Sequence, residues 1–215
     1  MGVGGRNRKG MVRFLTVGLL TLLFSLSMAF SAFGGQFGDA VAAYERGDYA
    51  TAFRLMKPLA EKGDARSQHN LGVMYDYGRG APQDSTEAWK WYRKAAEQGL
   101  PDAQHNLGLM YEKGQGVPQN YTEAGKWYRR AAEQGLPEAQ VNLGIMYYNG
   151  QGVPQDYTLA HMWLNIAASH YPASVKKSVN DVVHYRDIVD AKMTPAQVAE
   201  AQRLAREWKP KREAR

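Results

Sequence analysis

Cysteine is absent from this sequence of 215 residues. Its absence excludes disulfide frameworks, thiolate metal sites, thiol nucleophiles and lipid attachment through an N-terminal cysteine. The GxSxG, HExxH and Walker patterns are also absent, so none of these motifs points to hydrolysis or nucleotide binding. We therefore expect a protein without catalytic, cofactor-binding or metal-binding residues.

Acidic residues are absent from the first 34 positions, which hold four basic residues, Arg6, Arg8, Lys9 and Arg13. A mainly apolar run follows from Phe14 to Leu26, and small residues come after it. This run is shorter than the roughly 20 residues that span a bilayer. We expect 1–34 to be a secretory signal peptide, cleaved near 29–34, and the mature protein to lie in the periplasm. An uncleaved inner-membrane anchor is the alternative, and a start at Met11 instead of Met1 leaves the export prediction unchanged.

The formal charge of +6 at first suggests a nucleic-acid partner, but its distribution argues against one. Residues 1–34 hold four basic and no acidic side chains, and residues 203–215 hold six basic and two acidic ones. Residues 35–202 hold 17 basic and 19 acidic side chains. We therefore expect no nucleic-acid partner. Membrane contact is expected only during export and, weakly, through a frayed basic tail at 209–215.

A repeat of 36 residues occurs three times between 65 and 170. A fixed period of this length is typical of proteins built from stacked helical units. The recurring positions include Asn70/Asn106/Asn142, Leu71/Leu107/Leu143, Gly72/Gly108/Gly144, Tyr75/Tyr111/Tyr147, Gly78/Gly114/Gly150, Pro82/Pro118/Pro154, Ala88/Ala124/Ala160 and Trp91/Trp127/Trp163.

Each repeat is predicted to be a helical hairpin. In the second copy, apolar residues recur at helical spacing over about 102–113 and again over about 122–134. Gly135 follows the second helix, where a left-handed residue ends a helix, and Pro137 begins the next one. Glycine inside the first helix, at Gly108, costs about 1 kcal/mol relative to alanine. We expect close approach of helix backbones at that column and a hydrogen bond between units at the neighbouring asparagine.

The period divides the chain into units. We expect the following parts: a signal peptide at 1–34, an N-terminal hairpin at 35–63 that turns at Arg46-Gly47-Asp48, repeats at 64–99, 100–135 and 136–171, C-terminal capping helices at 172–208 with Thr194 as the last N-cap, and a basic tail at 209–215. Because one hairpin cannot bury its apolar face alone, the units must stack on one another.

The repeat resembles the Sel-one-like repeat, a branch of the tetratricopeptide-like repeats. The second copy carries its pattern at these positions: Ala103, Leu107-Gly108, Tyr111, Gly114, Gly116, Pro118, Ala124, Trp127, Ala131-Ala132 and Gly135. The resemblance implies an all-α fold, an α/α right-handed superhelix that serves as a scaffold without catalysis. Some exported relatives are cysteine-rich and described as penicillin-binding or β-lactamase-like, and the lack of cysteine separates this chain from them.

In tetratricopeptide-like stacks the first helix of each hairpin lines a concave groove. The resemblance therefore places three columns in the groove, at two positions before the repeat leucine, two after it and five after it. They form an apolar stripe flanked by imidazoles and carboxylates, which suits an extended peptide or a helix. The predicted partner-binding residues are His69, Val73, Asp76, His105, Leu109, Glu112, Ile145 and Tyr148, with Val141 completing the histidine column. The alternative is that Val73, Leu109 and Ile145 pack inside the stack.

Two other clusters have a plain structural explanation. His69 and His105 lie one unit apart and could approach within about 10 Å, but the third copy has Val141 there, so we expect no zinc site. Basic ladders recur on the second helices, with acids four residues later. We expect these ladders to form a solvated, charge-balanced convex face.

These features predict a monomeric scaffold of the bacterial cell envelope that binds a protein or peptide in its groove. The alternatives are an enzyme directed at the cell wall or β-lactams, and a repeat protein tethered by an uncleaved N-terminal helix.

Overall fold

A computed structural model describes residues 35–171 and 176–211, except the side chains of 176–179. The predicted signal peptide at 1–34 and the last four residues lie outside this part. Within it the chain forms helices and no strand, which confirms the all-α prediction. No described helix combines the length and apolarity that crossing a membrane requires.

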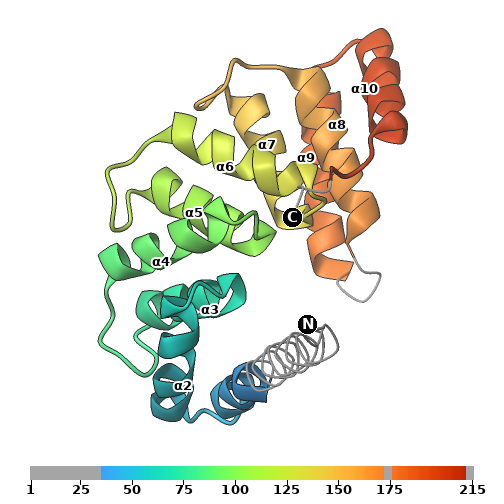
Figure 1. Ribbon diagram of the computed structural model, residues 1–215. Helices are drawn as coiled ribbons and strands as arrows, with labels where there is room; N and C mark the ends of the chain where they lie inside the picture. The colour runs from blue at the N-terminus through green and yellow to red at the C-terminus, as the bar shows by residue number, and fades with distance from the viewer. Residues whose placement is uncertain (1–34, 172–175, 212–215) are drawn as a thin grey trace, which may run out of the picture.

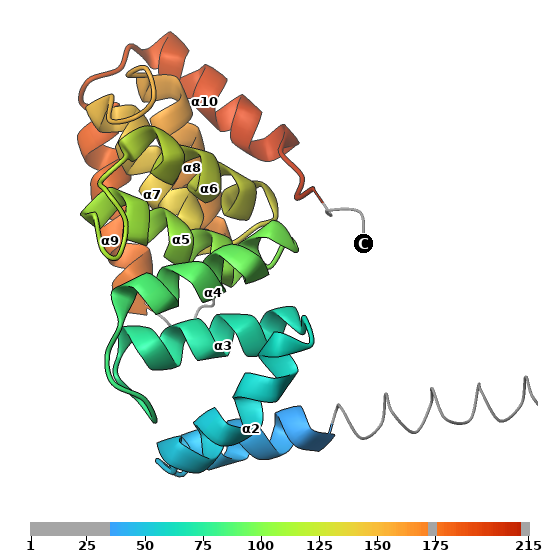
Figure 2. The same ribbon diagram turned by 60° about the vertical axis from the view of Figure 1, so that its left-hand side comes forward.

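Antiparallel helix pairs stack into a curved solenoid (Figure 1). A helix over 35–45 comes first. The others are α2 (Tyr49–Glu61), α3 (Ala65–Asp76), α4 (Ser85–Glu97), α5 (Pro101–Lys113), α6 (Tyr121–Glu133), α7 (Pro137–Asn149), α8 (Tyr157–His170), α9 (Lys176–Asp190) and α10 (Pro195–Glu207). Helices α3, α5 and α7 are the first helices of the three repeats, and α4, α6 and α8 are the second ones (Figure 2).

Local signals explain where the helices begin and end. The second helices begin after an Asp or Asn whose side chain accepts a hydrogen bond from a backbone N–H of the first turn, as Asn120 does from Glu123 at 3.0 Å. Helices α5 and α7 begin at proline and end at Gly114 and Gly150, whose φ values are 67° and 68°. The bounds of α5 and α6 agree with the predicted ones to within one residue.

The glycines inside the first helices accommodate side chains of the second helices. A Cβ atom on Gly108 would lie 2.6 Å from the ring of Tyr128, and one on Gly72 would lie 2.7 Å from the ring of Tyr92. On Gly144 it would lie 3.0 Å from Leu164. The prediction of close approach is therefore right, but in the first two repeats the atoms that approach belong to a tyrosine ring and not to a helix backbone.

The glycine-rich turns join each repeat to the one before it. A Cβ atom on Gly116, whose φ is 68°, would lie 2.1 Å from the carbonyl oxygen of Ser85 in the preceding repeat. Gly80 and Gly152 have the same relation to Tyr49 and Tyr121. Each turn thus packs against the start of the preceding second helix, where no side chain fits.

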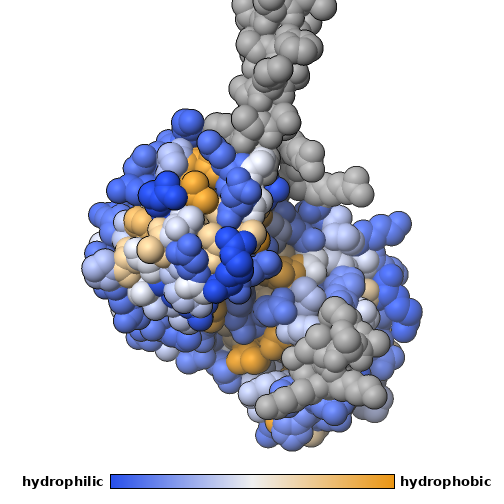
Figure 3. Space-filling model, turned by 90° about the horizontal axis from the view of Figure 1, so that it is seen from below, coloured by the Kyte–Doolittle hydropathy of each residue, from blue (hydrophilic) through white to orange (hydrophobic). Residues whose placement is uncertain are grey.

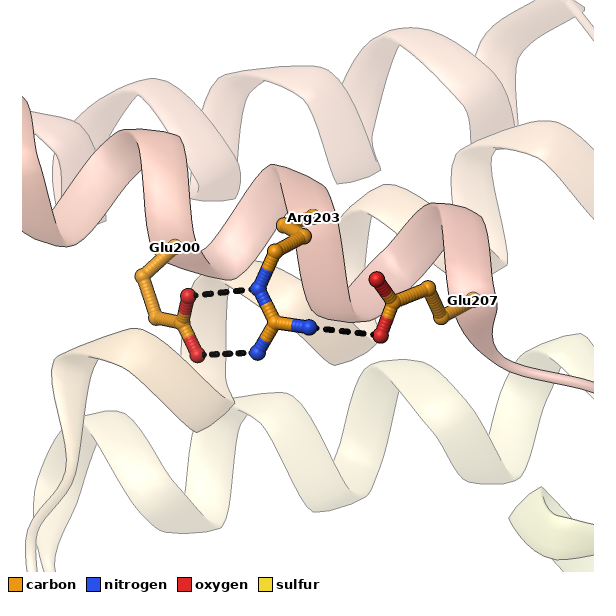
Figure 4. A network of polar contacts seen from close by, with 3 residues as sticks. All are labelled: Glu200, Arg203 and Glu207. Atoms are coloured by element: carbon orange, nitrogen blue, oxygen red, sulfur yellow. Dashed lines mark hydrogen bonds and ion pairs between the residues drawn. The ribbon is translucent and has the colours of Figure 1, made fainter.

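The C-terminal cap packs on the last repeat. Thr194 and Gln197 form a capping box at the start of α10, which confirms the predicted N-cap. Exposed ion pairs join Arg203 to Glu200 and Glu207 along the outer side of α10 (Figure 4).

The beginning of the basic tail is held against the stack. The backbone N–H of Lys211 donates to the carbonyl oxygen of Glu133 at 2.7 Å, and its ammonium lies 3.2 Å from the Glu133 carboxylate. The Trp208 ring lies 6.0 Å from that of Trp163. The prediction of a tail frayed from Lys209 is therefore wrong for 209–211. Sequence inspection could not find this contact, because it joins residues far apart in the chain.

Candidate partner-binding groove

The predicted groove residues all lie on α3, α5 and α7, which form a row. Amide side chains connect this row directly. The Nδ2 group of Asn106 on α5 lies 3.1 Å from Nε2 of His69 on α3, and Asn142 on α7 makes the same contact with His105 on α5. The predicted hydrogen bond between units at the asparagine column is confirmed.

The histidine contacts define a consistent tautomer. Nδ1 of His69 lies 3.3 Å from Oδ1 of Asn70, so Nδ1–H can donate while Nε2 accepts from Asn106. Burial lowers the pKa of His69 and of His105, although nearby carboxylates such as Asp102 act in the opposite direction. Both imidazoles are therefore neutral at pH 7. Within the described residues no group of three His, Cys, Asp or Glu side chains could hold a metal ion.

Tyrosines of the second helices extend this network. Tyr128 donates its hydroxyl hydrogen to the Glu112 carboxylate, and its ring lies 5.7 Å from that of His105. Tyr92 lies 5.6 Å from His69 in the first repeat. Burial is the main cause that raises the pKa of both phenols. Burial also raises the pKa of Asp76, and the Lys113 charge partly offsets this shift.

The third repeat supplies Asn142 to the network but has neither its histidine nor its tyrosine, and an apolar hollow lies on its C-terminal side. Valine replaces histidine at Val141, and leucine replaces tyrosine at Leu164. A hollow of about 220 Å³ lies among α7, α8 and α9. Its lining residues are Ile145, Tyr148, Asn149, Leu164, Tyr185, Ile188 and Val189.

A second hollow lies at the N-terminal end of the row, with a volume of about 280 Å³. It lies between the helix over 35–45 and helices α2 and α3. Its lining residues are Val41, Tyr44, Glu45, Met56, Asn70 and Val73. Seen from below, the surface shows apolar residues in a recess of the molecule (Figure 3).

The structure thus brings the predicted residues into one row but gives them different surroundings. Val73 lines one hollow, and Ile145 and Tyr148 line the other. Leu109 lies between them, half-buried against the core of the third repeat. His69 and His105 belong to the amide network. Whether these residues bind a partner stays a prediction.

Several lining residues were not predicted. Tyr44 and Glu45 come from the N-terminal hairpin, and Tyr185 and Ile188 come from α9. All four lie outside the three regular copies, so comparing equivalent positions of the repeats could not identify them. Two signals in the sequence show that this end differs: the replacement of histidine and tyrosine at Val141 and Leu164, and the loss of the repeat asparagine at Ser178.

The convex face carries the predicted charge pairs in part. Arg93 pairs with Glu97 at 2.8 Å, as the four-residue spacing indicates. Lys126 instead pairs with Glu123 at 2.6 Å, and Arg129 donates to the Tyr147 hydroxyl at 2.5 Å. The two ion pairs are exposed and of the kind that contributes little to stability, whereas the bond from Arg129 to the buried Tyr147 is partly buried.

Known proteins share this architecture. The Sel1 repeat matches residues 35–64, 65–100, 101–136 and 137–171. One similar solved structure is c5321, described as a protective antigen present in uropathogenic Escherichia coli strains displaying an SLR fold. It has 34% identity and a TM-score of 0.72, and the match covers 85% of this chain and 38% of that one. Another is a Sel1 repeat protein from Oxalobacter formigenes, with 31% identity, a TM-score of 0.62, and coverage of 79% and 74%.

Curated relatives include DAP3-binding cell death enhancer 1 of Mus musculus and of Rattus norvegicus. Each is 31% identical over 91 residues, which is 40% of this chain. The chain spans 17% of the length of these relatives. Sel1 repeat proteins are generally protein-interaction scaffolds, and the family is generally non-catalytic. Because the repeat matches more than half of the sequence, the chain belongs to the Sel1 repeat family.

Proposed function

We propose that this protein is an envelope scaffold that holds a segment of a partner protein in the groove along α3, α5 and α7. The observation that carries the proposal is the pair of apolar hollows, one at each end of this row. Exposed apolar recesses on a soluble domain are typical of interaction sites. The family's general role as a protein-interaction scaffold supports the same conclusion.

The cellular location is part of the proposal. The basic and apolar character of 1–34 supports export to the periplasm of a Gram-negative bacterium. N-terminal sequencing of the protein from an envelope fraction distinguishes cleavage from anchoring. A mature N-terminus near 30–35 is expected, and a chain that begins at Met1 or Met11 would contradict cleavage.

Photo-crosslinking in cells tests partner binding directly. A photoreactive amino acid at position 109 stands between the two hollows, and cross-linked partners are identified by mass spectrometry. The matched control places the same amino acid at Thr122, which is exposed on a second helix. Adducts at position 109 that are absent at position 122 are expected, and equal adduct patterns would contradict the groove assignment.

A substitution in the groove gives an independent test. Leu109→Asp should abolish the adducts formed from a photoreactive group at position 148, while helical circular dichroism and the melting temperature stay close to those of the wild type. Thr122→Asp adds the same charge outside the groove and should leave the adducts in place. If Leu109→Asp collapses the fold, Leu109 is a packing residue and the groove assignment is wrong at that position.

A second candidate function is an enzyme of β-lactam or cell-wall chemistry. One Ser-x-x-Lys sequence occurs at Ser174 to Lys177, a spacing found in β-lactamases, and these side chains lie outside the described residues. Turnover of nitrocefin or of peptidoglycan fragments by the purified protein tests this alternative. We expect no turnover above that of a Ser174→Ala variant.

A further inference from the structure

The row of first helices has an excess of acids, whereas helices α2, α4 and α6 have an excess of bases and α8 carries no Lys, Arg, Asp or Glu. Helices α3, α5 and α7 carry four acidic side chains, Asp76, Asp102, Glu112 and Glu138, against the two basic ones of Arg66 and Lys113. Helices α2, α4 and α6 carry eight basic side chains against five acidic ones. The helix over 35–45 adds Asp39 and Glu45 and no basic residue. Within the helix bounds, the net formal charge is therefore −2 on α3, α5 and α7 and +3 on α2, α4 and α6.

The acids of the two faces also differ in their partners. On α4 and α6, the carboxylates of Glu87, Glu97, Glu123 and Glu133 each lie within 2.6 to 3.2 Å of a Lys or Arg nitrogen. In the described part of the chain, none of the four acids of α3, α5 and α7 has an ion pair within 4.0 Å. Glu112 accepts the Tyr128 hydroxyl instead, and Asp76 is influenced by the Lys113 charge without forming an ion pair with it.

One acid without an ion pair lines a hollow, and others lie on the helices of the row. Glu45 itself lines the N-terminal hollow beside Val73. Asp102 and Glu138 lie in the first turns of α5 and α7, two of the helices that form the row. A partner segment on this surface therefore meets apolar recesses at the two ends and negative charge between them.

Helix packing gives the spacing of the two recesses. Neighbouring first helices pack about 10 Å apart, so Val73 on α3 and Ile145 on α7 are separated by about 20 Å. An extended chain advances about 3.3 Å per residue, so about six residues cover this distance.

We propose that the groove takes an extended, cationic segment of a partner protein, with an apolar side chain near each end and Lys or Arg between them. This inference rests on the proposed function and adds the chemistry of the partner. Charge complementarity of this kind accelerates association and discriminates against acidic competitors.

Three synthetic peptides test the inference by isothermal titration calorimetry against protein expressed from its complete coding sequence. Each has nine residues and blocked ends, with leucine at positions two and eight. The middle carries three lysines, three glutamines or three glutamates. We expect the lysine peptide to bind at least about tenfold more tightly than the glutamate peptide, with the glutamine peptide between them. Raising the salt from about 50 to 500 mM should reduce this preference severalfold.

Variants locate the charge preference in the groove. Asp76→Asn combined with Glu112→Gln keeps a hydrogen-bond acceptor for Tyr128. This variant should bind the lysine peptide about fivefold more weakly, with little change in its affinity for the glutamine peptide. The matched control, Glu87→Gln combined with Glu97→Gln, removes two acids of the convex face and should leave both affinities unchanged.

Three results would overturn the inference. The first is equal or tighter binding of the glutamate peptide, and the second is no binding of the lysine peptide at millimolar concentration. The third is a dimer in sedimentation experiments that the groove variant dissociates, because the occupant would then be a second copy of the chain. The proposed function is tested separately by the cross-links at position 109. If those appear while the peptides show no charge preference, the function stands and the cationic partner does not.

Discussion

The junctions of α3 with α5 and of α5 with α7 differ from the junction of α7 with α9. The first two are joined by directional bonds from Asn106 and Asn142 to histidines. The third has Val141 and Leu164 at the corresponding positions and opens into an apolar hollow. Polar networks fix a register because unpaired buried groups are costly. The first two junctions are thus specified more tightly than the last, and apolar surface remains available where the network stops.

The largest loss of unfolding free energy should come from adding a side chain at the repeat glycine of the second copy, Gly108. Gly108→Ala places a methyl group against the buried Tyr128 ring and should reduce the free energy of unfolding by about 2 to 3 kcal/mol. Gly144→Ala meets Leu164 at 3.0 Å and the carbonyl oxygen of Ala160 at 3.2 Å. Leu164 can shift, the helices need to separate by only a few tenths of an ångström, and alanine favours the helix, so the effect should stay within about 1 kcal/mol. Urea denaturation of both variants measures the difference. Equal losses would show that the tyrosine ring does not distinguish the two junctions.

A smaller loss of unfolding free energy is expected when His105, at the junction of α5 with α7, is replaced by the valine found at the corresponding position of the third repeat. His105→Val leaves the Asn142 amide without its histidine acceptor and should cost about 1 to 2 kcal/mol of unfolding free energy. His105→Val combined with Asn142→Leu removes both partners of this bond, and Tyr128, which also bonds to Asn142, keeps its bond to Glu112. The double variant should therefore recover most of the loss. Failure of the double variant to recover would show that histidine contributes through packing and not through the hydrogen bond.

The network should also make stability depend on pH. Burial lowers the pKa of His69 and of His105 in the folded protein, so the unfolded chain binds protons more readily. The contribution of these imidazoles is complete above about pH 6.5, the unfolded value, and is lost as the pH falls below it.

Melting temperatures between pH 7.5 and 5 measure this effect. The wild-type value should fall over this interval, and His105→Val should reduce the slope. His184→Gln, a change at an exposed residue of α9, serves as the control and should keep the wild-type slope. An unchanged slope in His105→Val would contradict the assignment to the network.

The smallest effect is expected on the outside of α10. Arg203→Gln removes the ion pairs with Glu200 and Glu207 (Figure 4). Because these pairs are exposed, the melting temperature should change by no more than about 2 °C in 150 mM salt. A larger drop would show that the cap is held by its surface charges and not by contacts such as that between Trp208 and Trp163.

Much of the fold could be predicted because the same helix-start, helix-end and apolar-spacing signals occur in all three repeats. Proline, glycine and capping residues fix the ends of α5 and α6, and the apolar spacing fixes their buried faces. The groove was predicted only as a set of columns. A column indicates that a residue lies on the row but not whether its side chain bonds to the next repeat, as His69 does, or lines a hollow, as Val73 does.

The contacts that escaped prediction join the regular repeats to the irregular ends. Tyr185 reaches the C-terminal hollow from α9, and Lys211 reaches the end of α6. Neither segment follows the 36-residue pattern, so its position depends on tertiary packing alone. The difference in charge between the first helices and helices α2, α4 and α6 was also not predicted, because the net charge of residues 35–202 adds the acids and bases of all helices together.

The return of the chain end to α6 changes how the stack is expected to come apart. In an open array each unit contacts only its neighbours, so a terminal unit can open without disturbing the rest. Here Lys211 is bonded to Glu133, so detaching α10 also breaks a contact with the second repeat. The C-terminal half is thereby coupled into one cooperative unit, and backbone amides of α6, α8 and α10 should exchange with solvent through a common opening.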